Sequence, residues 1–387
     1  MALVVVSGPI ANKWRNGGMA WVALSYLRGF ERLGFDTFFI EQLPVELCTD
    51  ADGNPVPFED CAPLRYFEKV VRDMGVSGRA ALVCGEGPRV GGANYGDVVG
   101  IAAAADFVVN ISGHLSAEAL RRACRRTAYV DLDPGYTQFW DAQGLRGHRL
   151  EGHDAYFTVG ANIGRQGCPI PTGDIRWIPT LPPVVLDDWP VVMEAEPRGF
   201  TTVGSWRGGF GPVTDGARTY GLKVHEFRKF VELPERTDAA FEVALDIHPA
   251  DGTDLDLLRR HGWAVVRPDA VAPGPVEFRR YVQGSWAEFS VAQGIYVETS
   301  SGWFSDRSVR YLASGKPVLV QDTGFGRSLP VGEGLLAFRS LEEAVAGVRE
   351  IERDHDRHAK AARAVAEEHF DSDGVLRRML DDAGVSP

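Results

Sequence analysis

A stretch in the second half of the chain combines the features of an anion-binding site. Residues 295–299, IYVET, are β-branched and aromatic and predict a strand, and the turn SSGWFSD (300–306) follows them. Ser305 or Asp306 then provides the N-cap of a predicted helix that ends at Gly315. Exposed backbone N–H groups and the helix dipole converge at such a turn and attract anions. We therefore expect an anion site at Ser301, Gly302, Trp303, Phe304, Ser305, Asp306 and Arg307.

Two basic residues accompany another predicted strand of the second half. The segment FTTVGSW (200–206) predicts the strand, Arg207 follows it directly, and Lys223 comes a short way further along. Ligands of parallel sheets bind at the carboxyl ends of the strands. We therefore expect Ser205, Arg207 and Lys223 to add charge and hydrogen bonds to the anion site. The alternative is that both cations are ordinary surface side chains.

In the first half, polar and aromatic residues follow the ends of two predicted strands. The candidates are His114, Asp131, Asp133, Tyr136, Phe139 and Trp140. The histidine lies just beyond VVNIS, and the others lie in VDLDPGYTQFW. A carboxylate at a strand end can orient hydroxyl groups, and aromatic rings can stack on a ligand. The alternatives are a structural histidine and a plain β-turn at DPGY.

These candidates depend on two runs of alternating strands and helices. In the first half the predicted strands are LVVV (3–6), DTFFI (36–40), AALVC (80–84), DFVVNIS (106–112) and TAYVDLD (127–133). In the second half they are FTTVGSW (200–206), AFEVALDIH (240–248), WAVVRP (263–268), GIYVETS (294–300) and PVLVQ (317–321). Alternation of this kind predicts parallel sheets with helices on both faces.

A proline-rich segment separates the two runs. Residues 179–199 contain five prolines and no periodic pattern, which indicates a linker. The tail from 341 to 384 is mostly helical in pattern, and 387 residues exceed what one core usually supports. The predicted division is a first domain over 1–180, a linker over 181–198, a second domain over 199–355 and C-terminal helices over 356–387.

Composition argues against several classes of protein. The net charge of −12 disfavours a nucleic-acid-binding surface. The five cysteines form no C-x-x-C pair and predict reduced thiols, not a disulfide framework or a zinc site. The opening MALVVVSGPI lacks the basic region of a signal peptide, and no apolar run is long enough to span a bilayer. We expect a cytoplasmic protein without a transmembrane segment.

Three segments, in the same order, resemble glycosyltransferases of the GT-B fold. ASGKPVLVQDTG carries that family's A-x-G-x-P-V segment after a helix, in Ala313, Gly315, Pro317 and Val318. NKWRNGGMAWVALSYLRGFERLGFDTFFI is similar to the opening Gly-Gly loop, helix and strand entry, and AEEHFDSDGVLRRMLDDAG is similar to the C-terminal helices. The likeness is strongest to the glycogen-synthase-like retaining branch and its spore-coat-protein-like relatives. It implies an α/β fold of two Rossmann-like domains that face each other across a cleft, with C-terminal helices crossing back to the first domain.

The resemblance implies a role for each candidate. The first domain would bind the acceptor, a small molecule or a glycan, and the second a nucleotide diphosphate sugar, with UDP- or dTDP-sugars favoured. Arg207 and Lys223 match a basic pair that holds the diphosphate in the family. His114 matches a histidine near the transferred sugar, and Asp133 would be the second catalytic residue. The nucleotide site would also include Gly17, Gly18, Ser205, Val265, Arg267 and Pro268, and the acceptor site would include Tyr136, Phe139 and Trp140.

One departure from the family concerns the donor ribose. The retaining branch usually carries E-x₇-E, with its second glutamate on the ribose, and the aligned positions here are Gly302 and Arg310. Asp306-Arg307 resembles instead the acidic-basic pair that opens this helix in the spore-coat-protein-like relatives. The chain therefore lacks the ribose-binding carboxylate at its usual place.

The remaining expectations concern the chemistry. Asp131-x-Asp133 has the form of the D-x-D metal site of GT-A glycosyltransferases, but those enzymes lack a second nucleotide-binding half, so we expect no obligatory metal ion. Cations and N–H groups would stabilise the leaving-group charge. The resemblance, and the lack of a histidine base in SGPIANKWRNGG, favour a retaining reaction. The alternatives are a sugar-nucleotide epimerase on the same fold and a non-catalytic protein that binds a phosphorylated small molecule.

Overall fold

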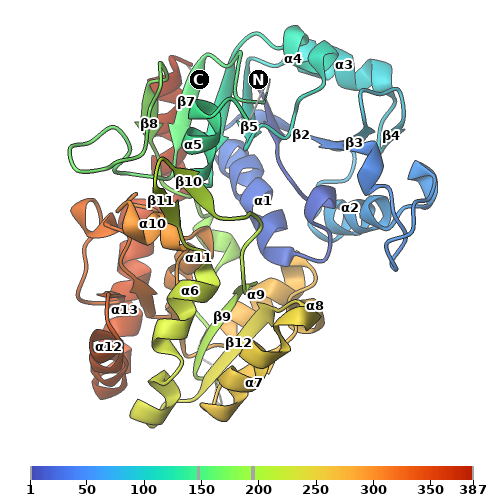
Figure 1. Cartoon of the computed structure of the whole chain (residues 1–387). Coiled ribbons are helices and arrows are strands. Elements are labelled where there is room, and N and C mark those ends of the chain that lie inside the picture. Colours follow the sequence, from blue (N-terminus) through green and yellow to red (C-terminus); the bar gives the residue numbers. More distant parts are fainter. Residues whose placement is uncertain (1, 146–148, 193–196, 386–387) are drawn as a thin grey trace.

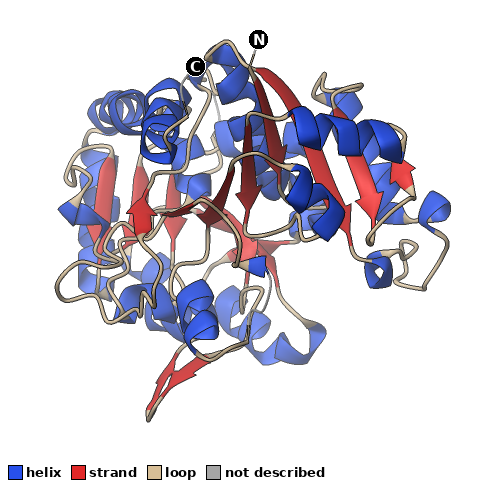
Figure 2. Ribbon diagram, turned by 90° about the horizontal axis from the view of Figure 1, so that it is seen from above, coloured by secondary structure: helices blue, strands red, loops and turns tan. Residues whose placement is uncertain are grey.

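Most strands belong to two separate parallel sheets. The structure is a computed structural model that describes residues 2–145, 149–192 and 197–385. Within these residues the first sheet has the order β4-β3-β2-β1-β5-β6-β7-β8 and the second the order β13-β12-β9-β14-β15-β16. Every neighbouring pair is parallel except β3 and β4. Figure 1 shows the first sheet above the second, and Figure 2 shows helices on both sides of the strands.

The first half of the chain builds the eight-stranded sheet. Its strands are β1 (Leu3–Ser7), β2 (Asp36–Leu43), β3 (Ala80–Cys84), β4 (Val90–Gly91), β5 (Phe107–Ile111), β6 (Thr127–Asp131), β7 (Ala155–Thr158) and β8 (Trp177–Pro179). Its helices are α1 (Gly17–Arg32), α2 (Ala62–Asp73), α3 (Tyr95–Ala104), α4 (Glu118–Ala123) and α5 (Tyr136–Ala142). All five predicted strands are confirmed. Strands β3, β5 and β6 are buried along their whole length because helices cover both faces of the sheet.

The second half builds the six-stranded sheet and a short antiparallel pair. Its strands are β9 (Phe200–Ser205), β10 (Val213–Asp215), β11 (Arg218–Tyr220), β12 (Phe241–Asp246), β13 (Ala264–Val266), β14 (Ala287–Ser290), β15 (Val318–Gln321) and β16 (Leu335–Phe338). Its helices are α6 (Lys223–Phe227), α7 (Gly252–Arg260), α8 (Pro268–Val271), α9 (Pro275–Gln283), α10 (Gly294–Glu298), α11 (Asp306–Ala313), α12 (Leu341–Arg353), α13 (His355–Val365) and α14 (Ser372–Ala383).

The strand predicted at 295–299 is wrong, because these residues form helix α10. The place between β9 and β15 in the sheet is taken by β14, which ends at Ser290. The helical turn buries Ile295 and Tyr296 in an apolar cluster shared with residues of the first half. β-Branched and aromatic residues have only a weak local preference for strands, and here tertiary burial outweighs it.

The C-terminal helices return to the first half of the chain, as the sequence predicts. Helix α14 crosses α1 closely, so that a Cβ added at Gly29 would lie 2.5 Å from Leu376. Arg32 of α1 also donates a hydrogen bond from Nε to Asp373 of α14 at 3.0 Å. Figure 1 accordingly shows both chain ends at the same end of the molecule. The final helix therefore ties the second sheet to the first.

Candidate functional site

A cleft of about 930 Å³ opens at the carboxyl ends of strands from both sheets. On the first-half side it is lined by the loop 13–16, by the start of α1 and by Asp133. On the second-half side it is lined by the ends of β9, β12 and β13, by α8 and by the start of α11. Ligands of parallel α/β sheets bind at this edge, so the cleft is the candidate functional site.

Two cations meet over the carboxyl end of β9. A Cβ added at Gly204 would lie 3.3 Å from Lys223 Nζ and 3.8 Å from a terminal nitrogen of Arg307. Arg307 donates from Nε to the fully buried Glu288 at 2.7 Å and from Nη1 to the carbonyl of Val203 at 2.7 Å. These contacts fix the guanidinium at the edge of the cleft, where its side chain is 13% exposed.

Of the two cations, Lys223 is the one whose protonation changes near neutral pH. It forms no ion pair with any residue that the structure describes, and burial together with the charge of Arg307 lowers its pKa from 10.5 to about 7. The unfolded chain therefore holds this proton up to a higher pH than the folded chain. Between about pH 7 and pH 10 the unfolded state binds more protons, so the stability of the fold rises with pH through this window. An anion beside Lys223 would favour the protonated amine.

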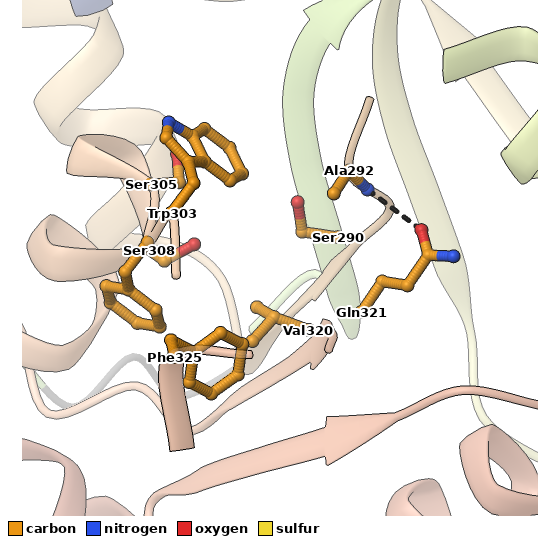
Figure 3. A pocket seen from close by; sticks show the side chains of 9 residues that line it. Ser290, Ala292, Trp303, Ser305, Ser308, Val320, Gln321 and Phe325 are labelled. Carbon is orange, nitrogen blue, oxygen red and sulfur yellow. Dashed lines mark hydrogen bonds between the residues drawn. The ribbon is translucent and has the colours of Figure 1, made fainter. Parts of the chain in front are cut away.

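The predicted N-terminus of α11 lies at the same place. Ser305 is the N-cap, and its Oγ accepts a hydrogen bond from the amide of Arg307 at 3.2 Å. Beneath it a cavity of only about 10 Å³ separates α11 from β14 and β15, lined by Ser290 and Ser308 among others (Figure 3). A cavity of this size holds about one water molecule. A ligand therefore reaches this helix terminus from the cleft side.

Just over half of the predicted site residues line the cleft. They are Gly18, Asp133, Ser205, Lys223, Val265, Arg267, Pro268, Trp303, Ser305, Asp306 and Arg307. The other predicted residues are not among its lining residues: Gly17, His114, Tyr136, Phe139, Trp140, Arg207, Ser301, Gly302 and Phe304.

The structure does not bring Arg207 into the cleft, so its predicted contact with an anion gains no support from the geometry. Its guanidinium makes two hydrogen bonds to the carboxylate of Asp251, 2.7 Å from Nε and 2.5 Å from Nη2. The side chain is 53% exposed and lies outside the cleft lining. The cation beside Lys223 is instead Arg307, which the sequence placed in the site as part of the turn and of the acidic-basic pair that opens the helix.

The predicted glycine turn does not offer its backbone to a ligand. Gly302 has a φ of +78°, and its amide donates to the carbonyl of Thr323 at 2.7 Å. A Cβ at Gly302 would lie 2.9 Å from the backbone nitrogen of Asn162, which belongs to the first half. Ser301 is fully buried, and Phe304 packs against Phe370. The predicted contact of these three residues with the anion therefore gains no support from the geometry, and Ser301 and Gly302 instead contact Asn162 of the first half.

Two of the predicted acceptor-binding rings are buried between the halves. Tyr136 and Phe139 are 1% and 2% exposed, and they pack against Phe210 and Tyr220 of the second half. Trp140 is partly buried against Phe210, with ring centroids 4.8 Å apart. The prediction that Tyr136 and Phe139 stack on an acceptor is wrong, because neither ring has a free face.

The polar candidates of the first half separate into lining and non-lining residues. Asp133 lines the cleft, and its carboxylate accepts a hydrogen bond from the hydroxyl of Tyr296 at 3.2 Å. His114 follows β5 but lies outside the lining, in a loop that packs against Arg149. The role of His114 in contacting a sugar therefore gains no support from the geometry.

Asp131 serves the fold. It is fully buried, and its two oxygens accept hydrogen bonds from Thr137, Gln138 and Thr158 at 2.6–2.8 Å. In the described part of the chain, no group of three or more His, Cys, Asp or Glu side chains has the arrangement of a metal site. The D-x-D pattern therefore reflects a buried hydrogen-bond network and the loop that follows it.

Sequence reasoning placed the glycines of the loop NKWRNGG in the site but missed Trp14, Arg15 and Asn16, which line the cleft. Arg15 has a φ of +63°, and its guanidinium lies 4.2 Å from the centroid of the Trp14 ring. The loop is held from behind by Glu41, a buried carboxylate that accepts from the amides of residues 10, 11 and 12 at 2.8–2.9 Å. Burial raises the pKa of Glu41 to about 7, although these hydrogen bonds oppose the shift. The sequence signal for this loop was Glu41 itself, an acidic residue directly after the predicted strand at 36–40.

The fold agrees with that of solved glycosyltransferases. Over 99% of this chain it superposes on an alpha-glucosyltransferase in complex with UDP and a 13-mer DNA (TM-score 0.60, 11% identity, all of that chain) and on Anabaena Alr3699/HepE in complex with UDP-glucose (TM-score 0.61, 11% identity, all of that chain). The chain has the fold of the GT-B glycosyltransferases. A glycosyltransferase from Rickettsia africae also matches over 99% of this chain and 97% of its own, with a TM-score of 0.52 and 12% identity.

The sequence comparisons add nothing to this likeness. No protein-family model and no curated protein matches the chain. The solved structures, at 11–12% identity, therefore confirm the predicted fold class, two facing Rossmann-like sheets with returning C-terminal helices, and leave the activity to the site. Among the described helices, none is long and apolar enough to cross a membrane.

Proposed function

We propose that the protein is a glycosyltransferase that moves a sugar from a nucleotide diphosphate sugar to an acceptor. The observation that carries this proposal is the meeting of Lys223, Arg307 and the N-terminus of α11 at one side of the cleft. Fixed cations and helix N–H groups stabilise the negative charge that develops on a leaving diphosphate. UDP-sugars are the favoured donors, since solved structures of the same fold hold UDP or UDP-glucose.

In this proposal the two sides of the cleft bind different substrates. The second domain, residues 199–355, binds the donor, and the first, residues 1–180, binds the acceptor, with 181–198 as the linker and 356–387 as the returning helices. Asp133 faces the cleft from the first side and would orient a sugar or acceptor hydroxyl. We propose that the reaction needs no metal ion, because Lys223 and Arg307 supply the positive charge. We also propose that it retains the configuration of the sugar, as the resemblance to the retaining branch implies.

Nucleoside diphosphates should stabilise the protein and free sugars should not. At a concentration of about 100 times Kd, binding to the folded state adds about 2.7 kcal/mol to the free energy of unfolding. We expect UDP to give the largest rise in melting temperature in a panel of UDP, dTDP, GDP and ADP. No response to any of the four would contradict the proposed function.

Two variants test whether the cleft is the binding site. Lys223→Met should weaken UDP binding by about 1.5–3 kcal/mol, the usual value of a charge-assisted contact. Arg207→Ala is the matched control, since its charge is neutralised by Asp251 outside the cleft lining. Equal losses in the two variants would show that the anion binds elsewhere.

UDP binding should be accompanied by proton uptake. With a pKa of about 7, Lys223 titrates near neutral pH, and the diphosphate would favour its charged form. We expect a net uptake of protons on binding near pH 7 and an affinity that falls as the pH rises above 7. Calorimetry in buffers of different ionisation enthalpy measures the number of protons, which should fall toward zero in Lys223→Met. Unchanged uptake in that variant would assign the proton to another group.

Product analysis separates the glycosyltransferase from the two other classes. Incubation with UDP-sugar and acceptors releases free UDP if the chain is a transferase. An epimerase would return an altered sugar nucleotide without any acceptor, and a binding protein would leave the donor unchanged. We propose an acceptor other than nucleic acid, in view of the net charge of −12, although one solved structure of this fold holds DNA. Competition by duplex DNA at low salt tests that choice.

A further inference from the structure

The cleft contains a carboxylate whose role the proposed function leaves open. Asp246 is the last residue of β12, is exposed, and lines the cleft. Its side chain makes no hydrogen bond or ion pair with any other residue in the described part of the chain. The other two carboxylates that the second half brings to the cleft are both engaged, Asp269 by Arg267 and Asp306 by Arg310.

The strand order places Asp246 between the two ends of the proposed nucleotide site. Lys223 and Arg307 lie over the end of β9, whose Ser205 is the register partner of Asp246 on β12. The next strand is β13, which contains Val265 and is followed by Arg267, two residues of the predicted nucleotide site. Neighbouring strands lie about 4.8 Å apart. A nucleotide laid across this edge with its diphosphate on β9 and its base on β13 must therefore pass its sugar over β12.

The usual place for a ribose-binding carboxylate is closed in this chain. The resembling branch carries a glutamate at the position of Arg310. Here the Arg310 side chain is only 2% exposed, pairs with Asp306, and is not among the residues that line the cleft. A different carboxylate would have to accept hydrogen bonds from the ribose hydroxyls.

From this arrangement we infer that Asp246 binds the 2′- and 3′-hydroxyl groups of the nucleotide ribose. In dinucleotide-binding sheets an acidic residue past the second strand takes the ribose hydroxyl, and β12 is the second parallel strand of this sheet in chain order. The carboxylate of Asp246 can accept two O–H donors at once. This inference rests on the proposed function, since it assumes a nucleotide in the cleft.

Binding of UDP, 2′-deoxy-UDP and 3′-deoxy-UDP to the full chain tests the assignment. We expect the wild type to bind UDP about tenfold more tightly than either deoxy analogue. Asp246→Asn and Asp246→Ala should each lose more than tenfold in affinity for UDP and a smaller factor for each analogue, which keeps one of the two hydroxyls, so that the preference for ribose disappears. Asp256→Asn, which removes an exposed carboxylate of α7 outside the cleft lining, should behave as the wild type.

Three results would overturn the assignment. Retention of the ribose preference in both Asp246 variants would show that another group holds the hydroxyls. Equal losses for UDP and both analogues would mean that Asp246 acts on the diphosphate site or the fold. A changed order of preference among UDP, GDP and ADP, with the ribose preference intact, would make it a base-reading residue. Failure of the wild type to bind any nucleoside diphosphate would instead contradict the proposed function itself, and the inference with it.

Discussion

Arg307→Met is expected to cost about 3–5 kcal/mol of stability and to abolish measurable UDP binding. Glu288, whose Oε1 accepts from Arg307 at 2.7 Å, is fully buried in β14, and its Oε2 has no hydrogen-bond partner among the described residues. Removal of one member of a buried pair leaves an uncompensated charge, which is the expensive outcome. Chemical denaturation measures the stability, and calorimetry measures the binding.

A second substitution separates the two losses. In Glu288→Gln/Arg307→Met the buried charge is gone, so most of the stability should return while UDP binding stays weak. Arg307→Lys is a further control, because it keeps a positive charge but cannot reproduce the three directed contacts to Glu288, Val203 and Ser290. Recovery of UDP binding in the double variant would show that Arg307 serves the fold alone.

The sequence predicted the elements of the site better than the direction of its side chains. Ser305 or Asp306 was predicted as an N-cap from residue type and position, and in the structure the N-cap is Ser305. Strand ends and helix starts are local properties, and they place Lys223 and Arg307 at the correct edge of the sheet. Local pattern therefore locates the cleft in an α/β chain, because the carboxyl ends of the strands gather there.

The directions of the side chains depend on contacts with residues far away in the sequence. Arg207 and Arg307 each follow an element that was predicted to border the anion site. In the structure Arg207 pairs with Asp251, 44 residues away, outside the cleft lining, whereas Arg307 pairs with the buried Glu288 at the edge of the cleft. From the sequence, Tyr136 is a candidate for stacking on a ligand. In the structure the ring of Phe210, in the loop before β10, packs against it. Neither partner could be assigned from a single sequence without a contact map.

The Gly-Gly loop shows the same limit. Gly17 and Gly18 were predicted to contact the nucleotide, but only Gly18 lines the cleft. Gly17 is buried where α1 meets the start of α9, and its amide donates to the carbonyl of Ala272 at 3.2 Å. Its lack of a side chain serves the contact between the two halves, and the predicted contact of Gly17 with a nucleotide gains no support from the geometry.

Gly17→Ala should therefore separate the two halves. The added Cβ would lie 2.0 Å from the carbonyl oxygen of Gly274 and 2.9 Å from Phe278 Cβ, and backbone cannot move aside as a flexible side chain can. We expect a loss of about 3 kcal/mol, the upper end of the usual cost of overpacking, and weaker UDP binding. Denaturant unfolding and small-angle scattering measure the two consequences, a lower stability and a larger radius of gyration.

The matched control for this substitution is Gly100→Ala in helix α3. A Cβ at Gly100 meets no atom within 4 Å, and alanine favours the helix, so this variant should gain up to about 1 kcal/mol. Trp21 of α1 also donates a hydrogen bond from Nε1 to the carbonyl of Pro275 at 2.8 Å, so α1 and α9 are joined at two points. If Gly17→Ala unfolds and scatters like the wild type, α1 and α9 are not in this contact in solution. The cleft would then be open without the nucleotide, and donor binding would have to close it.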